Sequence, residues 1–291
     1  MRFLQFYHNS AVQRLGIQLK HGGSIVDLNA ADSELPNTLL EFLKGGQKFL
    51  EKAKVVAGES KSTIPLSEVK LLPPISNPDK IACVGLNYKG HCKENNLPIP
   101  KQPIFFSKFS SCIIGPYDNI KYPEASNKVD WEVELAVVIG KEGYNISESD
   151  AMDHVFGYTI AQDISARDWQ KELNGGQFLL GKAMDTFCPI GPVVVTKESI
   201  SNVYNLGLRT KVNDIVKQDS RTDDMIYKID YLISRFSKCI TLLPGDIILT
   251  GTPQGVGAAF KPPQFLKPGD IITSEIDEIG FIKNKVVKTA K

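Results

Sequence analysis

Residues 129–139 carry acidic side chains at alternating positions in an otherwise apolar segment, VDWEVELAVVI. Successive side chains of a strand point to opposite faces, so Asp130, Glu132 and Glu134 share one face and the other face is apolar. Neighbours on one face lie roughly 6.5–7 Å apart, and two glutamates at a cleft repel each other unless a cation lies between them. Oxygen ligands of this kind suit Mg²⁺, Mn²⁺ or Ca²⁺. The alternative is a half-exposed strand that only displays acidic side chains.

A third carboxylate, Asp163, follows the next expected strand, residues 156–162. A carboxylate at the end of a strand, with Arg167 a few residues later, is a common way to build the edge of a site. Asp163 would equally serve as the N-cap of a following helix, with Arg167 paired to Asp168 or to another surface acid. The local sequence leaves both interpretations open.

A possible acid–base pair lies in residues 85–94, GLNYKGHCKE. If this segment is helical, His91 and Glu94 share a face because they are three residues apart. A glutamate that holds one imidazole nitrogen leaves the other free to act as a general base. The alternative is an exposed helical ion pair.

Two further segments have the composition of a binding site. Lys182, in GKAMDT, follows Gly175 and Gly176 and would present an amine to an anionic substrate. Residues 251–257, GTPQGVG, follow an expected strand and offer backbone N–H groups in a tight loop, although an ordinary multi-glycine turn explains them equally well. The loop matches neither a GxGxxG nor a Walker A pattern, so nucleotide binding has little support.

Composition limits the classes of protein to which these residues belong. The chain of 291 residues has 34 Lys+Arg and 33 Asp+Glu, a net charge of +1, so we expect no nucleic-acid partner. No apolar run approaches the roughly 18–20 residues that span a bilayer, so we expect no membrane partner. The 5 cysteines are scattered without a CxxC pair, which favours a reducing compartment.

The elements that must position these residues are mostly strands. We expect a small N-terminal domain, residues 1–72, and a larger catalytic domain, residues 73–291, joined at a proline-rich connector. Strands separated by turn signals dominate the larger unit, and regular β–α alternation is absent, so the fold class is α+β and β-rich. We expect few helices, at 39–53 with an interruption at Gly45-Gly46, at 147–155 and at 228–236.

Several blocks, in this order, resemble the fumarylacetoacetate hydrolase superfamily over most of residues 75–291. The blocks are GLNYKGHCKE, DWEVELAVVIG, QDISARDWQ, LLGKAMDTFCPIGP and LLPGDIILTGTPQGVG. The resemblance implies stacked mixed β-sheets with few short helices, a homodimer, and a divalent cation, usually Mg²⁺ with Mn²⁺ or Ca²⁺ as alternatives. It implies metal ligands at Glu132, Glu134 and Asp163, catalytic residues His91, Glu94 and Lys182, and substrate contacts from Arg167, Gln170 and Thr252.

The implied chemistry is that of a small 2-oxo acid whose enolate is stabilised by the metal and Lys182. Oxaloacetate keto–enol tautomerisation is the first expectation, and C–C bond hydrolysis of acylpyruvates and oxaloacetate decarboxylation are alternatives. A catalytically silent metabolite-binding protein is the remote alternative, because such a relative would be expected to have lost some of these residues. Residues 81–90 contain no carboxylate where fumarylacetoacetase has a further metal ligand, so fumarylacetoacetate itself is a poor candidate.

The resemblance implies the mitochondrial matrix, and a cytoplasmic location is the alternative. The first residues, MRFLQFYHNS, show no pattern of a secretory signal or an amphipathic presequence. The sequence therefore does not choose between the two locations.

Overall fold

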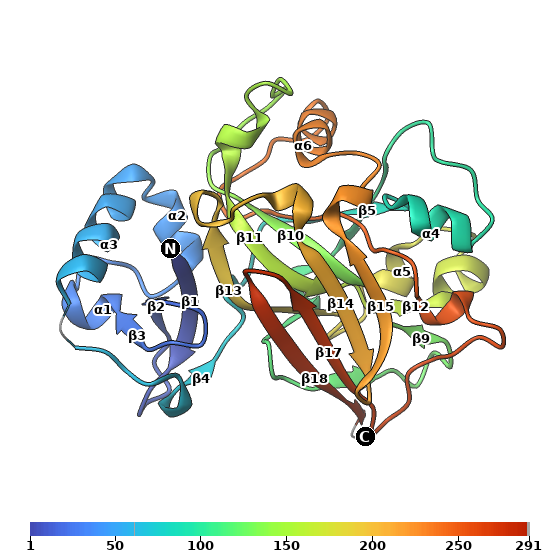
Figure 1. The fold of residues 1–291 in the computed structure, drawn as a ribbon, viewed down its shortest axis with the longest axis horizontal. Coiled ribbons are helices and arrows are strands. Elements are labelled where there is room, and N and C mark those ends of the chain that lie inside the picture. Colours follow the sequence, from blue (N-terminus) through green and yellow to red (C-terminus); the bar gives the residue numbers. More distant parts are fainter. Residues whose placement is uncertain (61, 290–291) are drawn as a thin grey trace.

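The computed structural model describes residues 1–60 and 62–289. Its largest feature is an 11-stranded mixed sheet with the strand order β3-β2-β1-β13-β11-β10-β16-β5-β6, while β4 pairs with β1 and β7 with β13 (Figure 1). The strands of this sheet are β1 (Arg2–Tyr7), β2 (Arg14–Gln18), β3 (Ile25–Asp27), β4 (Lys70–Leu71), β5 (Ile81–Gly85), β6 (Ile104–Lys108), β7 (Ile113–Ile114), β10 (Val133–Ile139), β11 (Val155–Gln162), β13 (Cys188–Thr196) and β16 (Ile247–Leu249).

A second sheet, with the order β15-β14-β17-β18-β8, packs on the central strands of the first (Figure 1). A short two-stranded ladder of β9 and β12 lies beside them. These strands are β8 (Ile120–Tyr122), β9 (Val129–Asp130), β12 (Ser165–Ala166), β14 (Gly207–Val212), β15 (Ile215–Arg221), β17 (Ile271–Ile276) and β18 (Gly280–Lys288).

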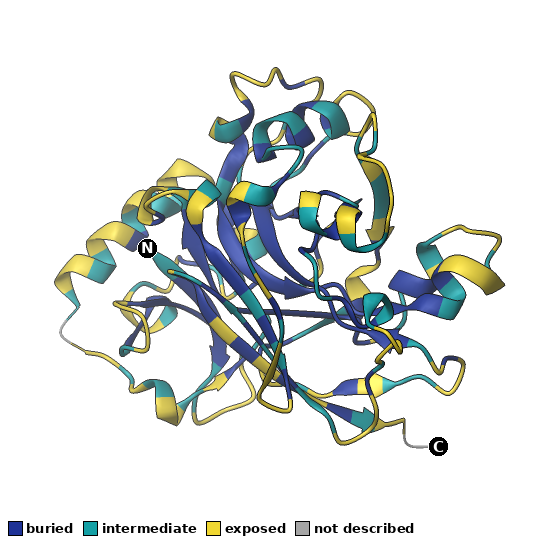
Figure 2. Cartoon of the chain, turned by 45° about the vertical axis from the view of Figure 1, so that its right-hand side comes forward, coloured by how far each residue is buried: buried dark blue, intermediate teal, exposed yellow. Residues whose placement is uncertain are grey.

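Both faces of β10 are buried, which explains why its sequence becomes continuously apolar after Glu134. Leu135 and Val137 pack into the core between the two sheets. Ala136 and Val138 belong to a second core, on the other face of the large sheet, which the helices near the N-terminus cover. Figure 2 shows the central strands as the most deeply buried part of the molecule. β10 is therefore fixed from both sides, and its acidic beginning is held in place by its apolar end.

The α-helices are few and short, and the β-rich α+β class with stacked sheets is confirmed. The break expected at Gly45-Gly46 separates α2 from α3, and Gly46 has a φ of +62° that favours glycine. None of the helices in the described residues is long and apolar enough to cross a membrane. The helices are α1 (Leu28–Ala31), α2 (Leu39–Lys44), α3 (Gln47–Glu59), α4 (Lys89–Glu94), α5 (Leu179–Lys182) and α6 (Ile229–Ser237).

The N-terminal residues gather on one side of the molecule (Figure 1). β1 is antiparallel to β13, with Phe3 opposite Val194. The large sheet therefore crosses the boundary expected between residues 1–72 and 73–291, and the division into two domains stays a proposal.

Two expected elements differ in the structure. The single strand expected over 129–139 is divided at Trp131 and Glu132, because β9 pairs with β12 while β10 pairs with β11. The Gln162 side chain accepts a hydrogen bond from the Glu132 N–H at 2.8 Å and takes the place of a strand partner there.

The helix expected over 147–155 is wrong in extent, since only a 3₁₀ turn at Ala151–His154 forms. The Ser147 hydroxyl donates to the Asp150 carboxylate at 2.8 Å and accepts from the Asp150 N–H at 3.2 Å. The second of these is the bond that an N-cap serine makes, but the segment forms only one 3₁₀ turn before β11 begins at Val155.

Candidate metal centre and active site

The ends of four neighbouring strands meet at one edge of the large sheet. β5 and β16 are parallel, so the segments that follow both strands leave at the same edge. β10 is antiparallel to β16 and to β11, so β10 begins at this edge and β11 ends there. The four segments expected to carry chemistry after β5, before β10, after β11 and after β16 are thereby brought together.

Glu132, Glu134 and Asp163 form a buried acidic triad at this edge, with ligand oxygens within 4.8 Å of one another. The Asp163 N–H donates to the Glu132 carbonyl at 2.9 Å, which continues the pairing of β10 and β11 up to the triad. Glu132 and Glu134 thus point to the same side, as expected, although the strand itself is broken at Glu132.

The surroundings of Glu132 and Glu134 shift the pKa values of these two glutamates in opposite directions. Burial alone would raise the pKa of Glu132, but Lys182 and Arg167 outweigh burial and lower that pKa. Burial raises the pKa of Glu134 well above its usual value, and the charges of Asp163 and Glu132 raise it further. Among the described residues Glu134 makes no ion pair, and it accepts a hydrogen bond from the Gly251 N–H at 2.7 Å. A divalent cation fits this arrangement, because three crowded carboxylates with one unpaired are the hard oxygen ligands that such an ion requires.

Cationic side chains surround the triad. Lys182 Nζ lies 2.7 Å from both Glu132 Oε2 and Asp163 Oδ2. Arg167 Nη1 lies 2.6 Å from Glu132 Oε1 and donates to Gln170 Oε1 at 3.0 Å. The local alternatives, Asp163 as a helix cap and Arg167 as the partner of Asp168, are both wrong: Arg167 pairs with buried acids, and Asp168 accepts from Ser126 instead.

His91 and Glu94 form a pair on α4, with Nδ1 of the imidazole 2.6 Å from Glu94 Oε1. His91 is 8% exposed, so the alternative of an exposed helical ion pair is wrong. Glu94 Oε2 accepts a hydrogen bond from the Gly255 N–H at 2.7 Å, which fixes the carboxylate on both sides. Nδ1 is engaged with Glu94, and the other ring nitrogen, Nε2, is the one left for a ligand in the cavity that His91 lines.

A cavity of about 110 Å³ joins these groups. Glu94 and Asp163 lie behind its wall, where they contact His91 and Lys182. Thr252 reaches the cavity, but its hydroxyl is already bonded to the Val133 carbonyl and the Gln218 side chain. The expected site residues that line the cavity are His91, Glu132, Glu134, Arg167, Gln170, Lys182 and Thr252.

The glycine-rich loop after β16 binds protein carboxylates. The N–H groups of Gly251, Gly255 and Gly257 donate to Glu134, Glu94 and Asp130 at 2.7, 2.7 and 2.6 Å. Side chains are excluded at these positions, since a Cβ on Gly255 would lie 2.1 Å from a backbone oxygen and a Cβ on Gly257 2.0 Å from another. The loop is therefore neither a nucleotide-binding loop nor an ordinary turn: it orients three acidic side chains of the site.

Two residues of the site were missed by the sequence analysis as functional candidates. Lys108, at the end of β6, is completely buried and contacts Asp163. Strand alternation puts Asp130 on the acidic face without indicating a role, and in the structure its carboxylate accepts from Arg167 Nε at 2.8 Å. A lysine that ends an apolar strand was a signal for the first, whereas the partner of Asp130 is distant in sequence.

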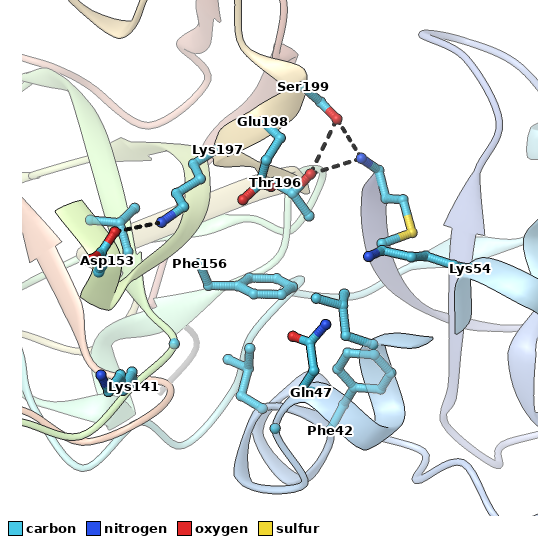
Figure 3. A pocket seen from close by; sticks show the side chains of 16 residues that line it. Phe42, Gln47, Lys54, Lys141, Asp153, Phe156, Thr196, Lys197, Glu198 and Ser199 are labelled. Atoms are coloured by element: carbon cyan, nitrogen blue, oxygen red, sulfur yellow. Dashed lines mark hydrogen bonds and ion pairs between the residues drawn. The ribbon is translucent and has the colours of Figure 1, made fainter. Parts of the chain in front are cut away.

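A larger cavity, of about 710 Å³, lies between α2, α3 and the end of β13 (Figure 3). Phe42 and Phe156 form part of its wall, and Lys54, Lys141 and Asp153 stand around it. None of the expected site residues lines it. We place the candidate site in the smaller cavity, because the acidic triad, the lysine and the histidine converge there.

Comparisons with known proteins agree with this architecture. The family model for the fumarylacetoacetate (FAA) hydrolase C-terminal domain matches residues 80–287. The chain is 54% identical over 288 residues to "Oxaloacetate tautomerase fahd2, mitochondrial" of Xenopus laevis, covering 99% of this chain and 90% of that protein. It is 51% identical over 288 residues to the human "Oxaloacetate tautomerase FAHD2A, mitochondrial", covering 99% and 92%.

Two solved structures share the fold over their full length. A fumarylacetoacetate hydrolase from Exiguobacterium antarcticum superposes with a TM-score of 0.86 at 33% identity, covering 99% of this chain and 100% of that one. A maleylpyruvate hydrolase from Sphingobium sp. SYK-6, solved with manganese(II) and pyruvate, gives a TM-score of 0.82 at 31% identity and covers 100% of both chains.

Proposed function

The chain belongs to the fumarylacetoacetate hydrolase family, and we propose that this enzyme interconverts the enol and keto forms of oxaloacetate with the help of Mg²⁺. The observation that carries the proposal is the convergence of the His91–Glu94 pair, Lys182 and the acidic triad on one small cavity. The names of relatives that are more than 50% identical over nearly the whole chain support the choice of oxaloacetate.

Glu132, Glu134 and Asp163 would hold the metal. When bound, a divalent cation supplies Lewis-acid polarisation of a 2-oxo group. Mg²⁺ is our first choice, and the manganese(II) in the structure of the maleylpyruvate hydrolase supports Mn²⁺ as an alternative. The all-oxygen ligand set is also compatible with Ca²⁺.

The residues of the chain would divide the remaining work. Arg167 and Gln170 bind and orient a carboxylate of the substrate, and Thr252 fixes the wall beside it. Lys182 holds positive charge near the oxygen on which the enolate charge develops, and preorganised charge of this kind is often the largest catalytic contribution. His91, oriented by Glu94, moves a proton between C3 and the 2-oxygen of the substrate.

A second candidate reaction is hydrolysis of the C–C bond of an acylpyruvate, because a structure of the same fold at 31% identity is that of a maleylpyruvate hydrolase. Decarboxylation of oxaloacetate would use the same enolate. A catalytically silent binding protein is not supported, since the family and its named relatives are enzymes.

A proton NMR time course of the purified protein with Mg²⁺ separates these reactions. Fresh enol-oxaloacetate and, separately, acetylpyruvate are the substrates, and Mg²⁺ alone is the control. Accelerated conversion of the enol signal to the keto signal, with acetylpyruvate unchanged, is the expected result. Acetate and pyruvate from the second substrate would identify a hydrolase instead, and pyruvate from oxaloacetate a decarboxylase.

We also propose a homodimer, a small N-terminal domain at residues 1–72 and a catalytic domain at 73–291. A family model that begins at residue 80 supports the division. Sedimentation of the purified protein tests the dimer.

The word "mitochondrial" in the names of the relatives supports location in the mitochondrion.

A further inference from the structure

We propose that Asp130 is a positioning residue that presets Arg167 for binding a substrate carboxylate. The inference rests on the proposed function, because it takes Arg167 to contact the substrate. It assigns a role to the one acidic residue of segment 129–139 that is neither in the triad nor exposed to the cavity.

Asp130 is completely buried, and each of its oxygens accepts two hydrogen bonds. Oδ2 accepts from Arg167 Nε at 2.8 Å and from the Ala258 N–H at 2.9 Å. Oδ1 accepts from the Gly257 N–H at 2.6 Å and from the Trp131 N–H at 2.8 Å. All four partners are donors, so the site requires a carboxylate that accepts on both oxygens.

These contacts leave one nitrogen of the Arg167 guanidinium, Nη2, for a ligand. Nε is bonded to Asp130, and Nη1 is bonded to Glu132 and Gln170. Nη2 is buried and has no hydrogen-bond partner within the described part of the chain. A buried donor without a partner is costly, and a carboxylate oxygen accepts a strong, charge-assisted hydrogen bond from a guanidinium N–H. Asp130 and Glu132 thus fix the plane of the guanidinium, and Arg167 lines the cavity.

Asp130 also connects Arg167 to the acid–base pair. The same loop that donates to Asp130 through Gly257 donates to Glu94 through Gly255. The Asp130 carboxylate therefore contacts both Arg167 and the loop whose Gly255 N–H orients Glu94, the partner of His91. A change at Asp130 should alter substrate binding first, because its most direct contact is with Arg167.

A purely structural role is the competing explanation, and Asp246 provides a matched control for it. Asp246 is also a buried carboxylate, accepting from the Leu243 N–H at 2.7 Å and pairing with Lys80 Nζ at 2.7 Å. It does not line the cavity. Asp246→Asn therefore loses a buried carboxylate without touching the site.

The test compares Asp130→Asn with Asp246→Asn in the full-length protein with Mg²⁺. The amide keeps the volume of the side chain but turns an N–H toward a donor. We expect Asp130→Asn to raise the Kd of oxalate and the KM of enol-oxaloacetate by about tenfold or more, the cost of one hydrogen bond to a charged group. The affinity for Mn²⁺ alone should change less than that for oxalate. Asp246→Asn should change neither Kd nor KM.

A double-mutant cycle with Arg167→Met gives a readout that loss of stability does not move. If Asp130 acts through Arg167, Asp130→Asn adds little to the Kd of oxalate in the Arg167→Met background. An unchanged Kd in the single variant, or the same fold-loss in both backgrounds, would overturn the inference.

Two further outcomes can be distinguished from a failure of the inference about Asp130. If Asp130→Asn does not fold, Asp130→Glu keeps the charge but moves the carboxylate by one methylene, and the same two criteria apply to it. If the wild-type protein binds oxalate but does not accelerate ketonisation, the proposed function fails. Asp130 is then judged on the dissociation constants, which need no turnover.

Discussion

Lys108 Nζ lies 2.7 Å from Asp163 Oδ1, and neither side chain is exposed. Burial has the largest single effect and would lower the pKa of Lys108, but the charge of Asp163, together with smaller effects of nearby cysteines, outweighs burial and the pKa is raised. The ammonium also donates to the carbonyls of Ile164 at 3.0 Å and Phe187 at 2.8 Å, and to the carbonyl of Lys182. A lysine outside the cavity thus fixes both a proposed metal ligand and the backbone of the proposed catalytic lysine.

We predict that Lys108→Met lowers the free energy of unfolding by about 3–5 kcal/mol, because it leaves the Asp163 carboxylate buried without this partner. Urea denaturation monitored by fluorescence measures the change. Mn²⁺ affinity should fall as well, since one oxygen of Asp163 loses the contact that orients it.

Lys128→Met is the control for this prediction. Lys128 pairs with Glu172 at the same distance, 2.7 Å, but both side chains are exposed. Surface pairs contribute little, so its removal should leave stability and metal affinity nearly unchanged. Equal effects of the two substitutions would show that the burial of the Lys108 pair is unimportant.

The sequence predicted the parts of this site that depend on local periodicity. Strand alternation placed Glu132 and Glu134 on one face, and helical spacing paired His91 with Glu94. Neither argument shows which strands become neighbours, so the contact between Asp163 and Glu132 required the resemblance to a known family or the fold itself.

The remaining features depend on contacts between distant segments. The break of the strand at Trp131 arises because β9 pairs with β12, whose sequence begins more than 30 residues later. The role of the glycine loop as a cradle for carboxylates required knowing that β16 lies beside β10. Lys108 and Asp130 were missed for the same reason, since their partners are remote in the chain.

Removing one ligand of the triad should abolish the metal site while preserving the fold. In Glu132→Ala we expect the affinity for Mn²⁺ or Mg²⁺ to fall more than about 100-fold, beyond the 10- to 100-fold typical of residues that only support a ligand. Turnover should fall with it. Isothermal titration calorimetry with each metal measures the affinity.

Glu172→Ala is the matched control, because Glu172 is an exposed glutamate in an ion pair with Lys128. Metal affinity and turnover that survive unchanged in Glu132→Ala would reject the ligand assignment.

Substitution of the histidine should separate proton transfer from metal binding. We predict that His91→Ala lowers kcat by about 10²- to 10⁴-fold, the usual contribution of a general acid–base group. Metal affinity should stay close to that of the wild type, because no ion pair or hydrogen bond connects His91 to the triad in the described residues. The enol-oxaloacetate assay and calorimetry give the two quantities.

His154→Ala tests whether loss of any partly buried histidine has this effect. The His154 ring contacts the Lys141 carbonyl at 2.9 Å, and His154 does not line the cavity. The His154→Ala variant should therefore keep the kcat of the wild type. An unchanged kcat in His91→Ala would place the proton chemistry elsewhere.

The glycine loop can be tested through the conformation and space it needs. Gly255 has a φ of +98°, and a Cβ there would lie 2.1 Å from the Lys217 carbonyl oxygen, so alanine must displace the loop. Its N–H holds Glu94, and displacement should therefore disorient His91 without removing any ionisable group. We expect Gly255→Ala to lower kcat by about 10- to 100-fold, because small misplacements of a catalytic group have effects of this size.

Gly176→Ala separates the effect of backbone conformation from the effect of the close contact. Gly176 also has a positive φ, +78°, but a Cβ there meets nothing within 4 Å. This variant carries the conformational strain alone and should retain nearly full kcat, with a loss of stability on the order of 1 kcal/mol. A Gly255→Ala variant as active as Gly176→Ala would mean that the hydrogen bond from the loop to Glu94 does not orient the proton-transfer pair.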